Sequence, residues 1–247
     1  MHHRILLIAL LVGRAAPVTA AAPEVKPGKY YRDRDTGTLL VERGRSGELT
    51  FEIESVGANC HSCSLAGPLR GTSGLADEGN GLTCRVGFKT VGRTVAVQAL
   101  SDTCRSFCGV RAYFDGSYHA LPKACTSAAR QARRDEFTVL YQASRYPAAV
   151  SSLNSLIDQC KAYMNWIEVD EVRNDLALSQ YNSGRPDECL ATLKATLAHG
   201  FDGEESLRGD GGRTMYLLNC DFDNYIPVAK ITWSTRALCE EAAQRSR

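Results

Sequence analysis

Two short stretches of this chain place cysteines at spacings that suit metal binding, redox chemistry or crosslinking. Cys60, His61 and Cys63 form the first stretch, and Cys104 and Cys108 form the second. Two close pairs of this kind can supply the ligands of a tetrahedral zinc site. A Cys-x-x-Cys pair also has the thioredoxin spacing, although redox chemistry needs it at a strand-to-helix turn. Which chemistry applies depends on the compartment in which the protein folds.

The beginning of the chain predicts export. Residues 1–21 contain a short basic start, an apolar run from Ile5 to Val12 and then small residues, which is the layout of a cleaved secretory signal peptide. The apolar run is far shorter than the roughly 20 residues that a membrane-spanning helix needs. We therefore expect a secreted or periplasmic protein without membrane insertion.

The chain has ten cysteines, and an even number in an exported protein favours disulfides over zinc or redox chemistry. In the helical half, the expected directions of the helices bring particular cysteines together. The expected bridges are Cys189–Cys239 and Cys125–Cys160 in the helical half, and Cys104–Cys108 and Cys63–Cys84 in the β half. Cys160–Cys220 is a rival of the second bridge, and Cys60 and Cys220 have no assigned partner.

Residues 26–122 have the pattern of an antiparallel β domain. Residues 49–54 alternate strictly between apolar and polar positions, and glycines stand where strands would turn. A further strand is expected to point Val110, Ala112 and Phe114 to one face. We expect roughly six to eight strands in a small barrel or sandwich, because a single sheet of that size leaves one apolar face in water.

Residues 125–247 have helical periodicity, so the fold class is α+β, with a β-barrel or sandwich followed by an all-α domain. Two blocks align at an offset of 40 residues, so that Tyr141 matches Tyr181 and Ser144 matches Gly184. These blocks resemble tetratricopeptide helical hairpins, whose usual repeat is about 34 residues. The resemblance implies a groove that binds a peptide or protein, with Arg173 and Tyr181 in it.

The charge of the chain is balanced, with 29 Lys and Arg against 28 Asp and Glu and a net charge of +1. Binding to nucleic acid depends on a basic surface, so no nucleic-acid partner is expected. Gly-rich phosphate loops are also missing from the sequence. We expect no cofactor and no metal.

Catalytic signatures are weak. Asp35, Thr36 and Gly37 form the aspartic-protease triplet, but charged residues precede it and a second half is missing, so a turn is expected. The three histidines after the signal peptide stand far apart in the sequence, at His61, His119 and His199. We therefore expect that the protein is not an enzyme. The alternative is a secreted hydrolase whose active site includes one of these histidines.

Tyrosine and arginine occur together in two places, Tyr31-Arg32 and Arg111 with Tyr113, and these residue types are enriched at binding hot spots. Residues 28–120 include the sequence CRSFCGVRAYFDGSY near their end. They resemble exported bacterial domains, some of which are similar to small periplasmic lysozyme inhibitors. The resemblance implies a non-catalytic module that binds a protein of the cell envelope, as an inhibitor of a cell-wall hydrolase or an immunity protein against one. A structural envelope scaffold is a further alternative, and the sequence leaves the oligomeric state open.

Overall fold

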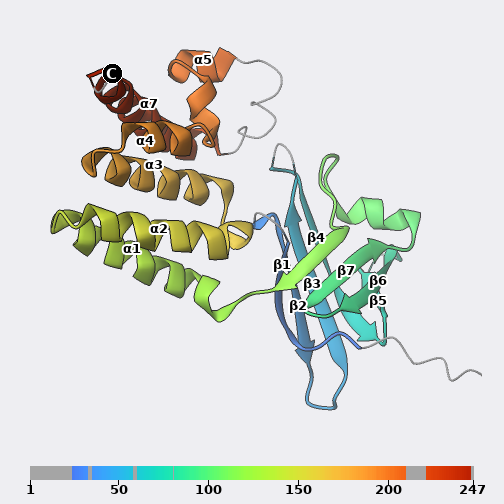
Figure 1. The fold of residues 1–247 in the computed structure, drawn as a ribbon. Helices are drawn as coiled ribbons and strands as arrows, with labels where there is room; N and C mark the ends of the chain where they lie inside the picture. The colour runs from blue at the N-terminus through green and yellow to red at the C-terminus, as the bar shows by residue number, and fades with distance from the viewer. Residues whose placement is uncertain (1–23, 33–34, 58–59, 80, 210–220, 246–247) are drawn as a thin grey trace, which may run out of the picture.

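The computed structural model describes residues 24–32, 35–57, 60–79, 81–209 and 221–245. These residues form a closed antiparallel β-barrel followed by a helical region that lies beside it (Figure 1). The predicted α+β class is therefore confirmed. Of the two forms predicted for the β half, a barrel or a sandwich, the structure has the barrel. The predicted signal peptide, residues 1–21, lies outside the described residues.

The barrel has eight strands, and each strand pairs with the next one along the chain. The last strand pairs back with the first, so that Tyr30 faces Ala120 across the closing ladder. Closure therefore pairs the first and last strands with each other, where an open sheet would have two exposed edges. The strands are β1 (Gly28–Arg32), β2 (Gly37–Arg43), β3 (Leu49–Val56), β4 (Ser62–Arg70), β5 (Ser73–Asp77), β6 (Thr83–Val91), β7 (Thr94–Ala99) and β8 (Gly116–Ala120).

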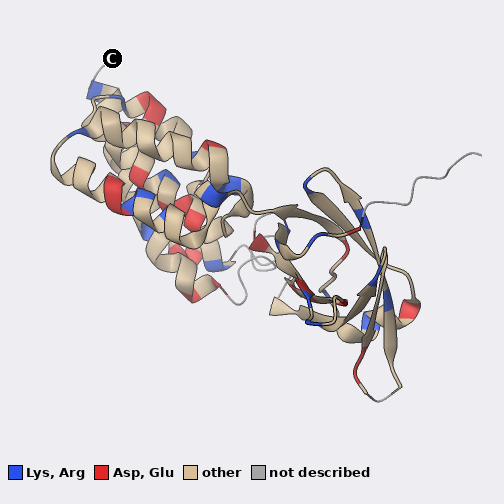
Figure 2. Ribbon diagram, turned by 90° about the horizontal axis from the view of Figure 1, so that it is seen from below, with Lys and Arg blue, Asp and Glu red and all other residues tan. Residues whose placement is uncertain are grey.

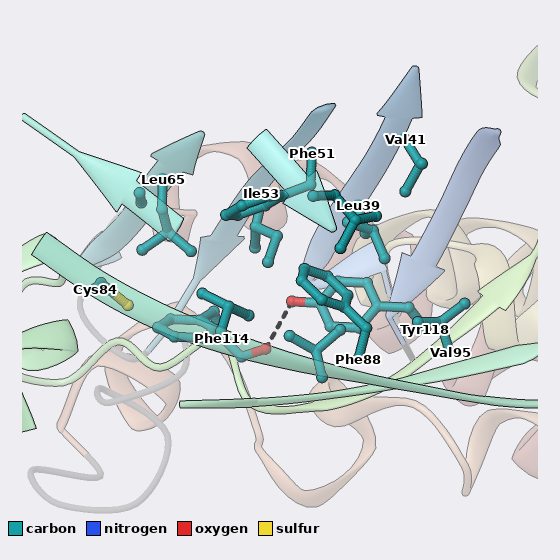
Figure 3. Packing of buried hydrophobic residues seen from close by; sticks show 14 of the residues in the cluster. Leu39, Val41, Phe51, Ile53, Leu65, Cys84, Phe88, Val95, Phe114 and Tyr118 are labelled. Carbon is teal, nitrogen blue, oxygen red and sulfur yellow. Dashed lines mark hydrogen bonds between the residues drawn. The ribbon is translucent and has the colours of Figure 1, made fainter. Parts of the chain in front are cut away.

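Alternation along the strands fills the inside of the barrel with apolar side chains (Figure 3). β3 shows this most clearly, because every second residue from Leu49 onward is buried and the residues between are exposed. The rings of Phe51 and Phe88 meet edge to face, with centroids 5.2 Å apart. The buried Tyr118 hydroxyl donates to the carbonyl oxygen of Phe114 at 2.8 Å. An interior of this size is just wide enough for side chains to fill.

The helical region begins with two antiparallel helix pairs, α1 with α2 and α3 with α4, and ends with the long helix α7 packed on α3 and α4. The α-helices are α1 (Ser127–Gln142), α2 (Tyr146–Cys160), α3 (Trp166–Asn182), α4 (Pro186–Leu193), α5 (Glu204–Gly209) and α7 (Phe222–Arg245). Short 3-10 helices connect some of the elements: η3 (Asp102–Phe107), η4 (Lys123–Cys125), η5 (Lys161–Tyr163) and η6 (Leu197–Gly200).

The two helix pairs have the same turn, 40 residues apart. Ser144 and Gly184 both adopt a left-handed backbone, with φ of 56° and 72°. After each of them, the amide of Arg145 or Arg185 donates to a carbonyl five residues earlier, at 2.9 and 3.0 Å. This is the C-terminal cap in which a left-handed residue ends a helix. The sequence offset thus corresponds to a structural repeat, while the likeness to tetratricopeptide hairpins stays a prediction.

The helical region contains both bridges predicted for it. Cys189 of α4 is bonded to Cys239 of α7, and Cys125 of η4 is bonded to Cys160 at the end of α2. The rival pairing of Cys160 is therefore wrong, and Cys220 lies outside the described residues. Together with two bridges in the barrel, these disulfides indicate an oxidising location, either extracellular or periplasmic.

Within the described ranges, the helices include none that combines the length and the apolar character needed to cross a bilayer. Basic and acidic positions are interspersed along the helices (Figure 2).

Candidate binding surface at the closed end of the barrel

One end of the barrel is closed by residues 104–115, which we call the closing segment. It lies between the C-terminal end of β7 and the N-terminal end of β8, and crosses to β4 and β6. Phe107, Ala112 and Phe114 are buried in the barrel core. The closing segment thus acts as a plug whose apolar side chains complete the interior.

Two disulfides attach the closing segment to the barrel wall. Cys104 is bonded to Cys84 of β6, and Cys108 is bonded to Cys63 of β4. The predicted bridges Cys104–Cys108 and Cys63–Cys84 are therefore wrong. The reason is the path of the chain: η3 buries Cys104 against β6, while Cys108 forms an isolated β-bridge with Cys63. Cys60 is also disulfide-bonded, and since Cys63 is bonded to Cys108, the two cysteines of the Cys-x-x-Cys stretch do not bridge each other as a thioredoxin-type pair does.

Hydrogen bonds also hold the backbone of the closing segment. The Arg105 guanidinium donates to the carbonyl oxygen of Ala112 at 2.8 Å and to that of Val110. The carbonyl oxygen of Tyr113 accepts from the Ser55 hydroxyl at 3.0 Å and from Nη1 of Arg32 at 2.7 Å. Because bonds at both ends of residues 110–113 fix this backbone, the side chains that point outward from it have defined positions.

The turn between β3 and β4 lies directly on the closing segment, and glycine makes this approach possible. A Cβ atom on Gly57 would lie 2.2 Å from the carbonyl oxygen of Arg111, which is too close for any other residue. The amide of Gly109 donates to the carbonyl oxygen of Ser62 at 2.8 Å. The end of β3, including Val56, is therefore adjacent to the closing segment.

The outward side chains at this end combine an aromatic ring, a cation and exposed aliphatic groups. The Arg32 guanidinium lies over the Tyr113 ring, 4.2 Å from its centroid, an arrangement that cation–π attraction favours. Tyr113 is 55% exposed, Val110 76% and Val56 53%. We call Arg32, Val56, Val110, Arg111 and Tyr113 the closed-end surface.

The structure thus brings together three of the six residues predicted to bind a partner, namely Arg32, Arg111 and Tyr113. Tyr31 lies on the outer face of β1, where the Lys29 ammonium is 5.4 Å from its ring centroid. The expectation that Val110 shares one face of a strand with Ala112 and Phe114 is wrong, because residues 109–115 are not a strand and Val110 is exposed while the other two are buried.

The other two predicted binding residues lie in the helical region and have structural contacts. Arg173 forms an ion pair with the buried Asp170 at 3.0 Å and donates to the carbonyl oxygen of Ala195 at 2.8 Å. Tyr181 packs against the cluster around the Cys189–Cys239 bridge. Both residues belong to α3, in the helical region that lies beside the barrel (Figure 1). Val56 and Val110 carry no sequence signal that marks them as binding residues, and only their exposure in the structure identifies them.

The three histidines lie in separate parts of the molecule. His61 lies against Gly109 at the closed end, and Nδ1 of His119 is 3.0 Å from the Thr94 hydroxyl on the outer face of the barrel. His199 lies in η6, where partial burial and the nearby Arg236 lower its pKa. Across the residues that the structure describes, no three His, Cys, Asp or Glu side chains are grouped so as to hold a metal ion.

When the chain is compared with known proteins, no family model, no curated protein and no solved structure matches it.

Proposed function

We propose that this protein is a non-catalytic binding module of the cell envelope, which binds a protein partner through the closed-end surface of the barrel. The observation that carries the proposal is the exposed Tyr113 ring stacked on Arg32, on a closing segment that two disulfides attach to the barrel. Tyrosine and arginine dominate the energetics of many interfaces. A rigid surface loses little conformational entropy on binding, which leaves more of the contact energy for affinity.

The filled interior of the barrel supports a function on its outside. Eight-stranded barrels hold either packed side chains or one small ligand. Here Phe51, Phe88, Phe114 and Tyr118 occupy the centre (Figure 3). A ligand of the size that open barrels enclose would have to displace these rings, so a surface partner is the better match.

The partner that we propose is a cell-wall hydrolase, with the protein acting as its inhibitor or as immunity against it. This choice rests on the resemblance of residues 28–120 to exported inhibitor domains, together with the disulfides that indicate the same oxidising location. The exposed valines of the closed-end surface, Val56 and Val110, would add apolar contacts to those of the Tyr113 ring.

The test measures binding and inhibition with purified muramidases and other cell-wall hydrolases. We expect a stable complex with at least one of them, and a loss of at least about tenfold in affinity for Tyr113→Ala. The matched control is Val91→Ala, because Val91 is 64% exposed at the end of β6, beside the turn to β7 and at the opposite end of the barrel.

Two results would contradict the proposal. One is the absence of a complex with every hydrolase tested. The other is a complex whose affinity is the same for Tyr113→Ala, Val91→Ala and the unchanged protein, since the partner would then bind elsewhere.

A further inference from the structure

A second surface, in the helical region, is hollowed into an open groove. It is a groove of about 650 Å³ between α2 and the turn that joins α3 to α4, a volume within the usual range for small-molecule sites. We call it the α2 groove. The polar residues that line it include Ser151, Asn154, Ser155, Asp158, Ser183 and Arg185.

Hydrogen bonds from α1 and within α2 hold one wall of the α2 groove in place. Nη2 of Arg133, on α1, donates to Oε1 of Gln159 at 2.7 Å, and Nε2 of Gln159 donates to the Ser155 hydroxyl at 2.9 Å. The buried side chain of Val150 forms part of the floor. These contacts give the groove a defined shape before any ligand enters.

Three polar side chains in the groove have unused hydrogen-bonding capacity. Ser151, Asn154 and Asp158 are exposed along one face of α2. Within the described ranges, none of the three has a hydrogen bond or an ion pair with the rest of the protein. They stand three and four residues apart, so they follow one another along the helix. The central one, Asn154, can donate and accept at once, as a peptide unit requires.

Two side chains of opposite charge line the α2 groove, Arg185 and Asp158. The turn that contains Arg185 lies beside the turn that precedes α2, because Nδ2 of Asn182 donates to the Tyr141 hydroxyl at 2.8 Å. Arg185 is therefore at the N-terminal end of α2, and Asp158 is near its C-terminal end. Arg185 also pairs with Glu188 at 3.1 Å, but both side chains are more than a third exposed, and such pairs are weak enough for a ligand to replace.

We propose that the α2 groove binds a short extended peptide, with its terminal carboxylate at Arg185 and its terminal ammonium at Asp158. From Pro147 to Asp158 the helix rises by about 16 Å, which an extended peptide of about four or five residues spans. The macrodipole of α2 favours the same orientation, since its N-terminus attracts a carboxylate and its C-terminus an ammonium. The residues that line the groove include no aromatic ring that would serve as a platform for a sugar.

Calorimetric titration of the full protein with tetraalanine tests the proposal. We expect binding of the peptide with free termini, and about fivefold weaker binding of the same peptide as its C-terminal amide. Arg185→Ala is expected to weaken binding of the free peptide by a similar factor and to leave binding of the amide unchanged. Asp158→Asn is expected to weaken binding of the free peptide. It should leave unchanged the binding of the same peptide with an acetylated N-terminus.

Arg145→Ala is the matched control, because Arg145 has the equivalent position in the first helix pair but does not line the groove. Because its turn lies beside that of Arg185, Arg145→Ala should weaken binding of the free peptide by less than Arg185→Ala does. The proposal is overturned if tetraalanine fails to bind at about 10 mM, or if Arg185→Ala and Arg145→Ala have equal effects. Binding of chitotetraose in place of tetraalanine would also overturn it, by identifying a glycan site. Failure here leaves the closed-end surface untouched, because the two surfaces share no residue.

Discussion

The barrel and the helical region bury different kinds of side chain. Among the described residues, and apart from tyrosines, Ser55 is the one polar side chain that is buried in the barrel. The helical region buries seven: Asp170, Asn174, Ser179, Gln180, Thr196, Thr232 and Thr235. The difference shows that the barrel is stabilised by apolar burial within a closed sheet, whereas the helices also need specific hydrogen bonds to settle how they pack.

These hydrogen bonds concentrate where α3 meets α7. Oδ2 of Asp170 accepts from the Tyr225 hydroxyl at 2.9 Å and from the amide of Leu197 at 2.8 Å. Farther along, Oδ1 of Asn174 accepts from the Thr232 hydroxyl at 2.8 Å. Each contact leaves a polar group unpaired if α7 slides along α3, so the network selects one position for the last helix.

The largest expected effect comes from the barrel core. Phe114→Ala removes a ring that is 2% exposed at the centre of the plug, and we expect it to cost about 3–5 kcal/mol of the free energy of unfolding. Urea denaturation of the oxidised protein, followed by far-ultraviolet circular dichroism, measures this cost. Val110→Ala in the same segment is the control and should change stability by less than about 0.5 kcal/mol. Equal effects of the two substitutions would mean that the plug is not packed into the core.

The next effect tests the polar junction. Tyr225→Phe removes the hydroxyl that donates to Asp170 and accepts from the amide of Ala198. We expect a loss of about 1–3 kcal/mol, because buried groups lose their partners. Both tryptophans of the chain, Trp166 and Trp233, are in the helical region, so their fluorescence reports on this part alone.

The control for this junction is Ser234→Ala, on the exposed face of α7. It should leave the fluorescence transition in place. If Tyr225→Phe also leaves that transition unchanged, the polar network does not stabilise the helices and the contrast with the barrel is wrong.

The smallest effect depends on pH. Burial raises the pKa of Asp175, on α3, to about 6, with Arg134 lowering it and Glu171 raising it. The folded protein therefore takes up this proton more readily than the unfolded chain, whose Asp has a pKa near 3.9. The stabilisation that this proton gives is complete below about pH 3.9 and is lost as the pH rises through about 6.

Asp175→Asn isolates this effect. The variant should gain stability relative to the unchanged protein above pH 6, and this gain should vanish toward pH 4. We expect less than about 1 kcal/mol, because the carboxyl is partly exposed to solvent. Tryptophan fluorescence during urea unfolding at several pH values measures the difference. A gain that is the same at every pH would show that Asp175 does not titrate in this range.

Much of the architecture could be predicted from local pattern. The alternation in residues 49–54 indicated β3, and the repeat offset indicated that Ser144 and Gly184 end equivalent helices. The bridge Cys189–Cys239 could be predicted because a helix has a known direction, so its two ends can be assigned. Tyr113 and Arg32 were recognised by residue type as candidates for binding.

Other features could not be predicted in this way. Cys104 and Cys108 are four residues apart, yet their partners come from two different strands, because the closing segment has no periodicity that reveals its path. Val110, Ala112 and Phe114 were expected on one face of a strand, but Val110 is exposed whereas the other two are buried. The polar lining of the α2 groove is also invisible locally, since Arg185 and Asp158 belong to different helix pairs.

The sequence by itself determined the order of strands and helices, the repeat, and the commitment of cysteines to crosslinks, because these depend on short-range periodicity and on the chemistry of exported thiols. Only the tertiary structure decided which strands hold the plug and which side chains share a surface. Arg32 and Tyr113 are 81 residues apart, and they meet because β8 pairs with β1. That closure depends on the packing of the whole barrel, which no short stretch of the chain contains.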